Sequence, residues 1–103
     1  MYRWPRNPSA GAGVATDVIV DLYSSSFCGA CTATRAVLDE AARLVPAASV
    51  VERNVATVPD AAAAEDIRST PTVIVRREDG TEVFRAEGVP TLNQVLVAAA
   101  KAV

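Results

Sequence analysis

The 103-residue sequence predicts a single α/β domain, with a mixed four-stranded sheet flanked by helices in the order β-α-β-α-β-β-α. Three observations support this fold class. Short β-branched segments of strand length alternate with segments whose apolar residues recur every three or four positions. The first β-α-β segment implies two parallel strands joined by a right-handed crossover. A tight-turn sequence between the last two strands makes them antiparallel, so the sheet is mixed.

The first two strands and the helix between them occupy residues 17–55. Residues 17–23, DVIVDLY, are apolar at consecutive positions, which is typical of a central strand covered on both faces. From Cys31 the apolar residues instead follow one face of a helix that ends at Pro46. That face consists of Val37, Leu38, Ala41, Ala42 and Val45. Residues 49–55, SVVERNV, form the second predicted strand.

A short helix and a hairpin follow. Pro59 and Asp60 stand ahead of a run of alanines, which predicts a helix start. Residues 70–77, TPTVIVRR, are the third predicted strand, and residues 82–87, EVFRAE, are the fourth. Residues 78–81, EDGT, contain the Asp-Gly pair that is typical of a hairpin turn.

The last element is a helix that follows Gly88. Thr91 and Gln94 have the T-x-x-Q spacing of a capping box, which predicts the helix start. The apolar stripe of this helix consists of Leu92, Val95, Leu96, Ala99 and Val103. These positions recur at helical spacing, so the helix is expected to pack one face on the sheet.

Residues 1–16 contain prolines and glycines with little periodicity, which predicts an irregular N-terminal arm ahead of a domain at residues 17–103. Trp4, the single tryptophan, lies in this arm. It is expected either to pack loosely on the domain or to anchor a partner.

The composition narrows the range of partners. A net charge of −2 gives no reason to expect nucleic acid or an anionic membrane as a partner. No apolar run approaches the roughly 18 residues of a membrane span, and the N-terminus lacks the apolar segment of a signal peptide. We therefore expect a cytoplasmic protein, and a monomer. The absence of histidine excludes every Ser-His or Cys-His nucleophile arrangement.

The only two cysteines, Cys28 and Cys31, lie where the first strand gives way to the first helix. Unpaired N–H groups and the positive end of the helix dipole would favour a thiolate over a thiol at Cys28. Such a thiolate attacks disulfides, and Cys31 could resolve the mixed disulfide that forms. Gly29 and Ala30 keep the intervening turn small, so that a bulky disulfide could approach.

The cysteine pair allows three other interpretations. Four-coordinate zinc needs four ligands, so carboxylates or a second chain would have to complete a metal or iron–sulfur site. A structural disulfide between neighbours this close would stabilise the fold little. The two cysteines could also be inert buried side chains. A redox-active dithiol is favoured, because this C-x-x-C lies between a strand and a helix of a β-α-β unit.

Three longer segments also resemble a known family. FCGACTATRAVLDEAA resembles the thioredoxin sequence W-C-G-P-C-K and the following helix, which carries L-D-E. NVATVPDAAAAEDIRSTPTVIV resembles the segments N-x-D-x-x-P and I-R-x-x-P-T of the same family, and EDGTEVFRAEG resembles its hairpin and final glycine. The resemblance to thioredoxins spans residues 17–103. It implies a thioredoxin-like fold without the family's first strand and helix, for which residues 1–16 are too short.

The resemblance also implies an activity. It implies a thiol-disulfide oxidoreductase in which Cys28 attacks a protein disulfide and Cys31 resolves the mixed disulfide. No bound cofactor or metal is implied, and a reductase or a low-molecular-weight thiol would regenerate the dithiol. The expected substrate-binding residues around the thiols are Phe27, Gly29, Ala30, Thr70, Pro71 and Gly88.

Three of these residues are expected to form a groove opposite the cysteines. By the resemblance, the Thr70–Pro71 peptide bond would be cis and face the thiols, and the backbone of Thr70 would pair with an extended substrate segment. Gly88 would line the same groove. Without the resemblance, Pro71 could merely start a strand and Gly88 could be an ordinary turn glycine.

The sequence departs from the family around the cysteines. Phe27 replaces the usual tryptophan, Ala30 replaces a proline, and Thr32 replaces a lysine. These changes predict a dithiol tuned differently from that of a standard thioredoxin.

A second departure affects proton transfer. The position of the family's buried acid holds Leu22, and Asp21, one residue earlier, would face the other side of the strand unless Ser24–Ser26 contains a bulge. Glu52 replaces the buried lysine that pairs with this acid in the family. The proton relay is therefore predicted to be missing.

Two alternative functions remain open. A glutaredoxin-like protein would use a low-molecular-weight thiol, but SSSFC and EGVPTLNQ lack the basic residue and the G-G with acidic residues that would bind glutathione. A non-catalytic binding module on the same scaffold, with a vestigial or regulatory dithiol, is motivated by the missing relay and the Trp4 arm.

Overall fold

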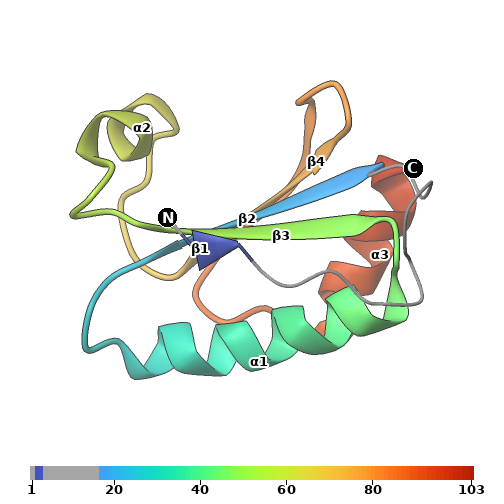
Figure 1. Ribbon diagram of the computed structural model, residues 1–103, viewed down its shortest axis with the longest axis horizontal. Coiled ribbons are helices and arrows are strands. Elements are labelled where there is room, and N and C mark those ends of the chain that lie inside the picture. Colours follow the sequence, from blue (N-terminus) through green and yellow to red (C-terminus); the bar gives the residue numbers. More distant parts are fainter. Residues whose placement is uncertain (1, 4–16) are drawn as a thin grey trace.

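A computed structural model describes residues 2–3 and 17–103, and within them the chain forms five strands and three helices (Figure 1). The strands are β1 (Tyr2–Arg3), β2 (Val18–Ser24), β3 (Ala48–Asn54), β4 (Thr72–Arg77) and β5 (Glu82–Glu87). The helices are α1 (Gly29–Leu44), α2 (Pro59–Ala64) and α3 (Leu92–Ala102), none of them long and apolar enough to cross a membrane. Trp4 and the rest of the predicted arm beyond Tyr2 and Arg3 lie outside the described residues.

The sheet is mixed, as predicted, with the strand order β1-β3-β2-β4-β5. Strand β2 runs parallel to β3 and antiparallel to β4, and β5 runs antiparallel to β4. The four predicted strands are therefore present with the predicted pairing. Strand β1 is additional: it pairs antiparallel with β3 over Tyr2 and Arg3, and a segment of this length is too short to show the alternation that predicts a strand.

Helices cover both faces of the sheet (Figure 1). Helices α1 and α3 lie together on one face, and α2 lies on the other. The larger core, under α1 and α3, contains Val18, Val20, Leu22, Leu38, Val50, Val73, Val75 and Val95. The smaller core, under α2, contains Tyr23, Ala62 and Ile74. Strand β2 contributes to both cores, which explains why apolar residues precede and follow Asp21 at consecutive positions and confirms that the strand is central.

Local sequence rules determine where several elements begin. Pro59 is the first residue of α2, where its missing N–H removes no helical hydrogen bond. Thr91 and Gln94 form the predicted capping box of α3: each side-chain oxygen accepts the other residue's backbone N–H, at 2.9 and 3.1 Å. Gly80, with a φ of 96°, lies in the predicted turn between β4 and β5.

Candidate active site

The cysteine pair begins helix α1. Cys28 is the N-cap residue, with an extended backbone, and the helix starts at Gly29. The backbone N–H of Cys31 donates to Cys28 Sγ at 3.1 Å, so the sulfur takes the place that a side-chain oxygen usually has at a helix N-cap. The cysteines are joined as a disulfide, with Cα atoms 5.2 Å apart. The pair thus lies at the strand-to-helix junction, where the sequence placed it.

The two cysteines differ in their access to solvent. Cys31 is fully buried against the sheet, whereas Cys28 is partly exposed. Gly29 and Ala30 are exposed on the first turn of α1, and a Cβ at Gly29 would meet no atom within 4 Å. Only Cys28 is therefore open to a large partner.

Phe27 precedes the pair and is the most exposed large apolar residue of the described chain. Its backbone is in the left-handed region, with a φ of 57°. This conformation costs a bulky residue roughly 1–2 kcal/mol, and the exposed ring makes no core contact to offset that cost. Strain of this kind at a solvent-facing residue is often found at binding sites.

The predicted groove residues lie together near the loop before Cys28. Ser25 Oγ and Thr70 Oγ1 share a hydrogen bond of 2.7 Å, which joins this loop to the segment that precedes β4. The Thr70–Pro71 peptide bond is cis. The backbone N–H of Gly88 donates to the carbonyl oxygen of Pro71 at 2.8 Å, so the chain after β5 lies beside the same segment. Thr70, Pro71 and Gly88 are thereby held at one end of the sheet.

A polar pocket of about 410 Å³ adjoins Cys28 on the side toward β3. Its polar lining includes Ser25, Ser26, Thr32, Arg35 and Asn54. The sequence indicated no binding role for Arg35 or Asn54: Arg35 belongs to no motif, and Asn54 was matched only as the first residue of the N-x-D-x-x-P segment. Their assembly depends on the parallel pairing of β2 with β3, which brings the end of β3 beside the start of α1.

Glu52 on β3 is a second feature of the site, which the sequence identified only as a replacement of the family's buried lysine and not by its contacts. It is 8% exposed, and its carboxylate accepts hydrogen bonds from Ser24 Oγ at 2.6 Å and from Arg35 Nε and Nη2 at 2.7 and 2.6 Å. It lies opposite Leu22 in the β2–β3 pairing. Its position two residues after Val50, on the inward side of a strand, was a signal that could have identified it as a buried acid.

Glu52 and Arg35 stabilise each other's charged forms. The hydrogen bonds from Arg35 lower the pKa of Glu52 against the effect of burial, and Ser24 contributes in the same direction. The same contact raises the pKa of Arg35. Both groups are therefore ionised at neutral pH, which makes Glu52 a weak proton acceptor.

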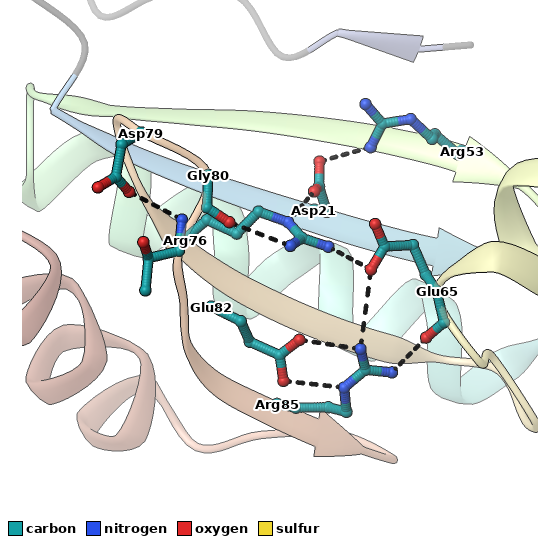
Figure 2. Close-up of polar contacts among 9 residues, drawn as sticks. Asp21, Arg53, Glu65, Arg76, Asp79, Gly80, Glu82 and Arg85 are labelled. Atoms are coloured by element: carbon teal, nitrogen blue, oxygen red, sulfur yellow. Dashed lines mark hydrogen bonds and ion pairs between the residues drawn. The ribbon is translucent and has the colours of Figure 1, made fainter.

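Asp21 lies on the sheet face away from α1 (Figure 2), as the sequence predicts. The β2–β3 register runs residue by residue from Val18 to Ser24, so no bulge shifts Asp21. Leu22 is buried in the core under α1. Asp21 instead pairs with Arg53 at 2.5 Å and with Arg76 at 3.1 Å. The prediction that Asp21 does not stand in for the family's buried acid is confirmed.

The ion pairs continue from Asp21 across the same face (Figure 2). Arg76 also binds Glu65, at 2.7 Å, and Arg85 binds Glu82 at 2.9 Å. Arg85 Nη1 donates to the backbone oxygen of Glu65 at 2.8 Å. The network joins four strands to the end of α2 and contains no residue of the cysteine site.

Several solved thioredoxin structures are similar to this chain. The thioredoxin of Fasciola hepatica is 23% identical, with a TM-score of 0.72, and the match covers 82% of this chain and 83% of that one. A mutant thioredoxin from Halobacterium salinarum is 22% identical, with a TM-score of 0.76 and coverage of 84% and 75%. Mitochondrial thioredoxin 3 from Saccharomyces cerevisiae is 20% identical, with a TM-score of 0.72 and coverage of 84% and 79%. These likenesses show the fold.

The family comparison extends over most of the chain. The family model for thioredoxin matches residues 12–101. The comparison with curated proteins finds no match. Together with the Cys28–Cys31 pair, the family match supports a thiol-disulfide oxidoreductase in general. On this match, the chain belongs to the thioredoxin family.

Proposed function

We propose that the protein is a thiol-disulfide oxidoreductase in which Cys28 attacks a protein disulfide and Cys31 resolves the mixed disulfide. The observation that carries this proposal is the difference in access between the two cysteines. Cys28 is partly exposed at the N-cap of α1, and Cys31 is fully buried one turn behind it. A protein disulfide can reach the first sulfur, and the second can reach only its neighbour.

The reaction consists of two thiol–disulfide exchanges. The Cys28 thiolate bonds to one substrate sulfur, the substrate S–S bond breaks, and the other substrate sulfur leaves as a thiolate that takes up a proton. Cys31 then attacks Cys28 Sγ, the Cys28–Cys31 disulfide forms, and the remaining substrate sulfur leaves as a thiolate that takes up the proton that Cys31 gives up. The substrate gains two electrons and the protein dithiol loses two.

The start of α1 supports the first step. The backbone N–H of Cys31 lies 3.1 Å from Cys28 Sγ, where it can stabilise a negative sulfur. The positive end of the helix dipole acts in the same direction. Both favour the thiolate, which is the attacking species.

The surrounding residues would bind the substrate. Phe27 offers an exposed ring beside Cys28, and Gly29 and Ala30 leave room for the substrate backbone. The backbone of Thr70 would pair with an extended substrate segment, with Pro71 and Gly88 lining the groove. The hydrogen bond between Ser25 and Thr70 and the one from Gly88 to Pro71 support this arrangement, because they hold the three segments together.

Protein disulfides are the proposed substrates. The dithiol would be regenerated by a reductase or a low-molecular-weight thiol, and no bound cofactor takes part in either exchange. In a reducing cytoplasm the protein would act as a reductant.

Insulin reduction with dithiothreitol tests the proposal. The wild type should accelerate the precipitation of insulin chains over dithiothreitol alone, and Cys28→Ser should abolish the acceleration. Circular dichroism of Cys28→Ser checks that the variant is folded. A folded wild type that gives no acceleration would contradict the proposal and favour the non-catalytic binding module.

A further inference from the structure

We propose that the polar pocket beside Cys28 binds an acidic side chain that flanks the disulfide of a protein substrate. The proposal rests on the proposed function, because it concerns the substrate of the same reaction. Three residues next to Cys28 would make the contacts: Ser26, Arg35 and Asn54. They come from the loop before α1, from α1 itself and from the end of β3. The Thr32 hydroxyl donates to the Cys28 carbonyl oxygen and accepts from Arg35, so it offers the ligand no proton.

Asn54 presents a hydrogen-bond donor to the pocket. Its Oδ1 accepts the backbone N–H of Ala56 at 2.9 Å, which fixes the orientation of the amide. Its Nδ2 therefore lies on the other side, 3.4 Å from Ser26 Oγ. Since Ser26 Oγ accepts this hydrogen bond, its own proton remains available to a ligand.

Arg35 supplies the positive charge. Its Nε and Nη2 donate to Glu52, which fixes the guanidinium on the inner side. Its Nη1 lies 3.5 Å from Thr32 Oγ1, which places this end of the guanidinium toward the pocket. The Arg35 side chain is 38% exposed, so a ligand can reach it.

No acidic side chain lines this pocket among the described residues. Glu52 lies behind Arg35 with a side chain that is 10% exposed, and both of its carboxylate oxygens already accept hydrogen bonds. The lining of the pocket therefore presents one cation with N–H and O–H donors, and the anion that pairs with this cation, Glu52, lies behind it.

A carboxylate is the side-chain group that this donor set fits best. It can accept from Arg35 Nη1 and Asn54 Nδ2 together, and hydrogen bonds between charged partners are about twice as strong as neutral ones. A lysine in the same place would be repelled by Arg35. The pocket volume of about 410 Å³ exceeds that of a carboxylate, so it can hold an acidic side chain and part of the adjoining backbone.

The preference for an acidic neighbour can be measured as a rate, because a carboxylate beside a disulfide otherwise slows the attack of a thiolate. A negative charge next to a disulfide repels an approaching thiolate. An acidic neighbour that accelerates the attack of Cys28 therefore requires a positive site beside it. Arg35 is such a site.

The test uses three short peptides whose single cysteine is joined to 2-thiopyridine and flanked on both sides by Glu, Gln or Lys. The protein is reduced beforehand, freed of reductant and mixed in excess with each peptide. The release of 2-thiopyridone gives the second-order rate constant of the first exchange. We expect the Glu peptide to react about two- to fivefold faster than the Gln peptide, the size expected of one half-exposed ion pair, and the Lys peptide to react slowest.

Three variants locate the preference. Arg35→Gln combined with Glu52→Gln removes the cation without leaving a buried unpaired carboxylate, and its Glu-to-Gln rate ratio should fall to one or below. Arg35→Lys keeps a cation and should retain part of the preference. Lys101→Gln removes a cation from α3, away from the pocket, and should keep the wild-type ratio. The preference should also shrink as salt is added.

The outcomes separate the two proposals. A wild type that reacts with all three peptides but not faster with Glu than with Gln overturns the pocket proposal and leaves the proposed function in place. A preference that survives in the double variant or in high salt also overturns it. A wild type that reacts with none of the peptides contradicts the proposed function itself.

Discussion

Phe27 shows how the site exposes an apolar side chain at a cost. Its left-handed backbone and fully exposed ring stabilise nothing within the described fold. Phe27 is a large aromatic residue, as is the tryptophan of the thioredoxin sequence W-C-G-P-C-K that this segment resembles. In the proposed function, this ring contacts a substrate beside Cys28.

Replacing Phe27 with alanine should separate binding from stability. We expect Phe27→Ala to change the free energy of unfolding by less than about 0.5 kcal/mol, because the ring is exposed. The kcat/KM for insulin should fall roughly fivefold, because covering part of the ring contributes about 1 kcal/mol of binding. Urea unfolding and the insulin assay measure the two quantities. Val97 is another exposed apolar residue, so Val97→Ala is the matched control. If the two variants have equal kcat/KM values, Phe27 does not contact the substrate.

At the scale of elements, the contact between Arg35 and Glu52 joins the first half of α1 to β3. The carboxylate is nearly buried, and Ser24 on β2 donates to it as well. Three elements that surround the cysteine pair are thus held by one acid. The same contact holds the guanidinium at the edge of the pocket beside Cys28.

The lowered pKa of Glu52 predicts how stability depends on pH. Because the folded pKa lies below the unfolded value of about 4.5, the stabilisation by this pair is fully present above that value and is lost as the pH falls through the folded pKa. Glu52→Gln should therefore lower the free energy of unfolding by about 1 kcal/mol at pH 7 and flatten its decline at acid pH. Urea unfolding between about pH 7 and pH 3 measures both effects.

Glu40→Gln is the control for this experiment. Glu40 pairs with Arg43 on the exposed face of α1, where solvent screens the interaction. Glu40→Gln should change the decline of the free energy of unfolding at acid pH much less than Glu52→Gln does. If this decline is as steep in Glu52→Gln as in the wild type, the stabilising role given to the Arg35–Glu52 pair is contradicted.

The sequence predicted the elements around the site but not the contacts between them. The start of α1 was predictable because the strand pattern ends and the helical period begins around Cys28. The Arg35–Glu52 contact was not, because the residues are 17 positions apart and meet only once β3 pairs with β2. Glu52 was predicted only as a replaced lysine, and its new partner depends on a helix position that no local rule indicates.

At the scale of the whole molecule, the two faces of the sheet differ in character. The face under α1 and α3 is aliphatic except for the buried Glu52, which accepts hydrogen bonds from Ser24 and Arg35. The other face is covered in part by the short α2, and beside the Tyr23–Ile74 core it carries the ion pairs of Asp21, Arg53 and Arg76 (Figure 2). Charged side chains are found on the face that is only partly covered by a helix, because there they can contact solvent or pair with each other.

Asp21 should therefore affect stability and not redox chemistry. We expect Asp21→Asn to lower the free energy of unfolding by about 1–3 kcal/mol, because two arginines lose a largely buried partner. The pH profile of insulin reduction should keep its wild-type midpoint, because Asp21 lies on the face away from the cysteines. Urea unfolding and pH–rate profiles are the measurements.

Glu82→Gln, at the exposed end of the same network, is the control for Asp21→Asn. Glu82→Gln should lower the free energy of unfolding by less than about 1 kcal/mol. An Asp21→Asn variant with a shifted pH profile and unchanged stability would instead identify Asp21 as a proton-transfer group.

The fold as a whole was largely predictable, and the ion-pair network was not. Alternation of β-branched and helical segments predicted the mixed sheet, and the consecutive apolar residues of β2 predicted its central position. Asp21 was expected to face away from the cysteines, but its partners Arg53 and Arg76 are 32 and 55 residues distant along the chain. Pairings of that range depend on which strands are neighbours in the sheet, and no local sequence pattern shows that.

The central claim is that Cys28 attacks and Cys31 resolves, and covalent trapping tests it most directly. Each single variant, Cys31→Ser and Cys28→Ser, is incubated with insulin, quenched with acid and analysed by intact-protein mass spectrometry. We predict a stable mixed disulfide through Cys28 in Cys31→Ser and none in Cys28→Ser, because Cys31 is fully buried. A mixed disulfide that forms equally well through Cys31 would contradict the account.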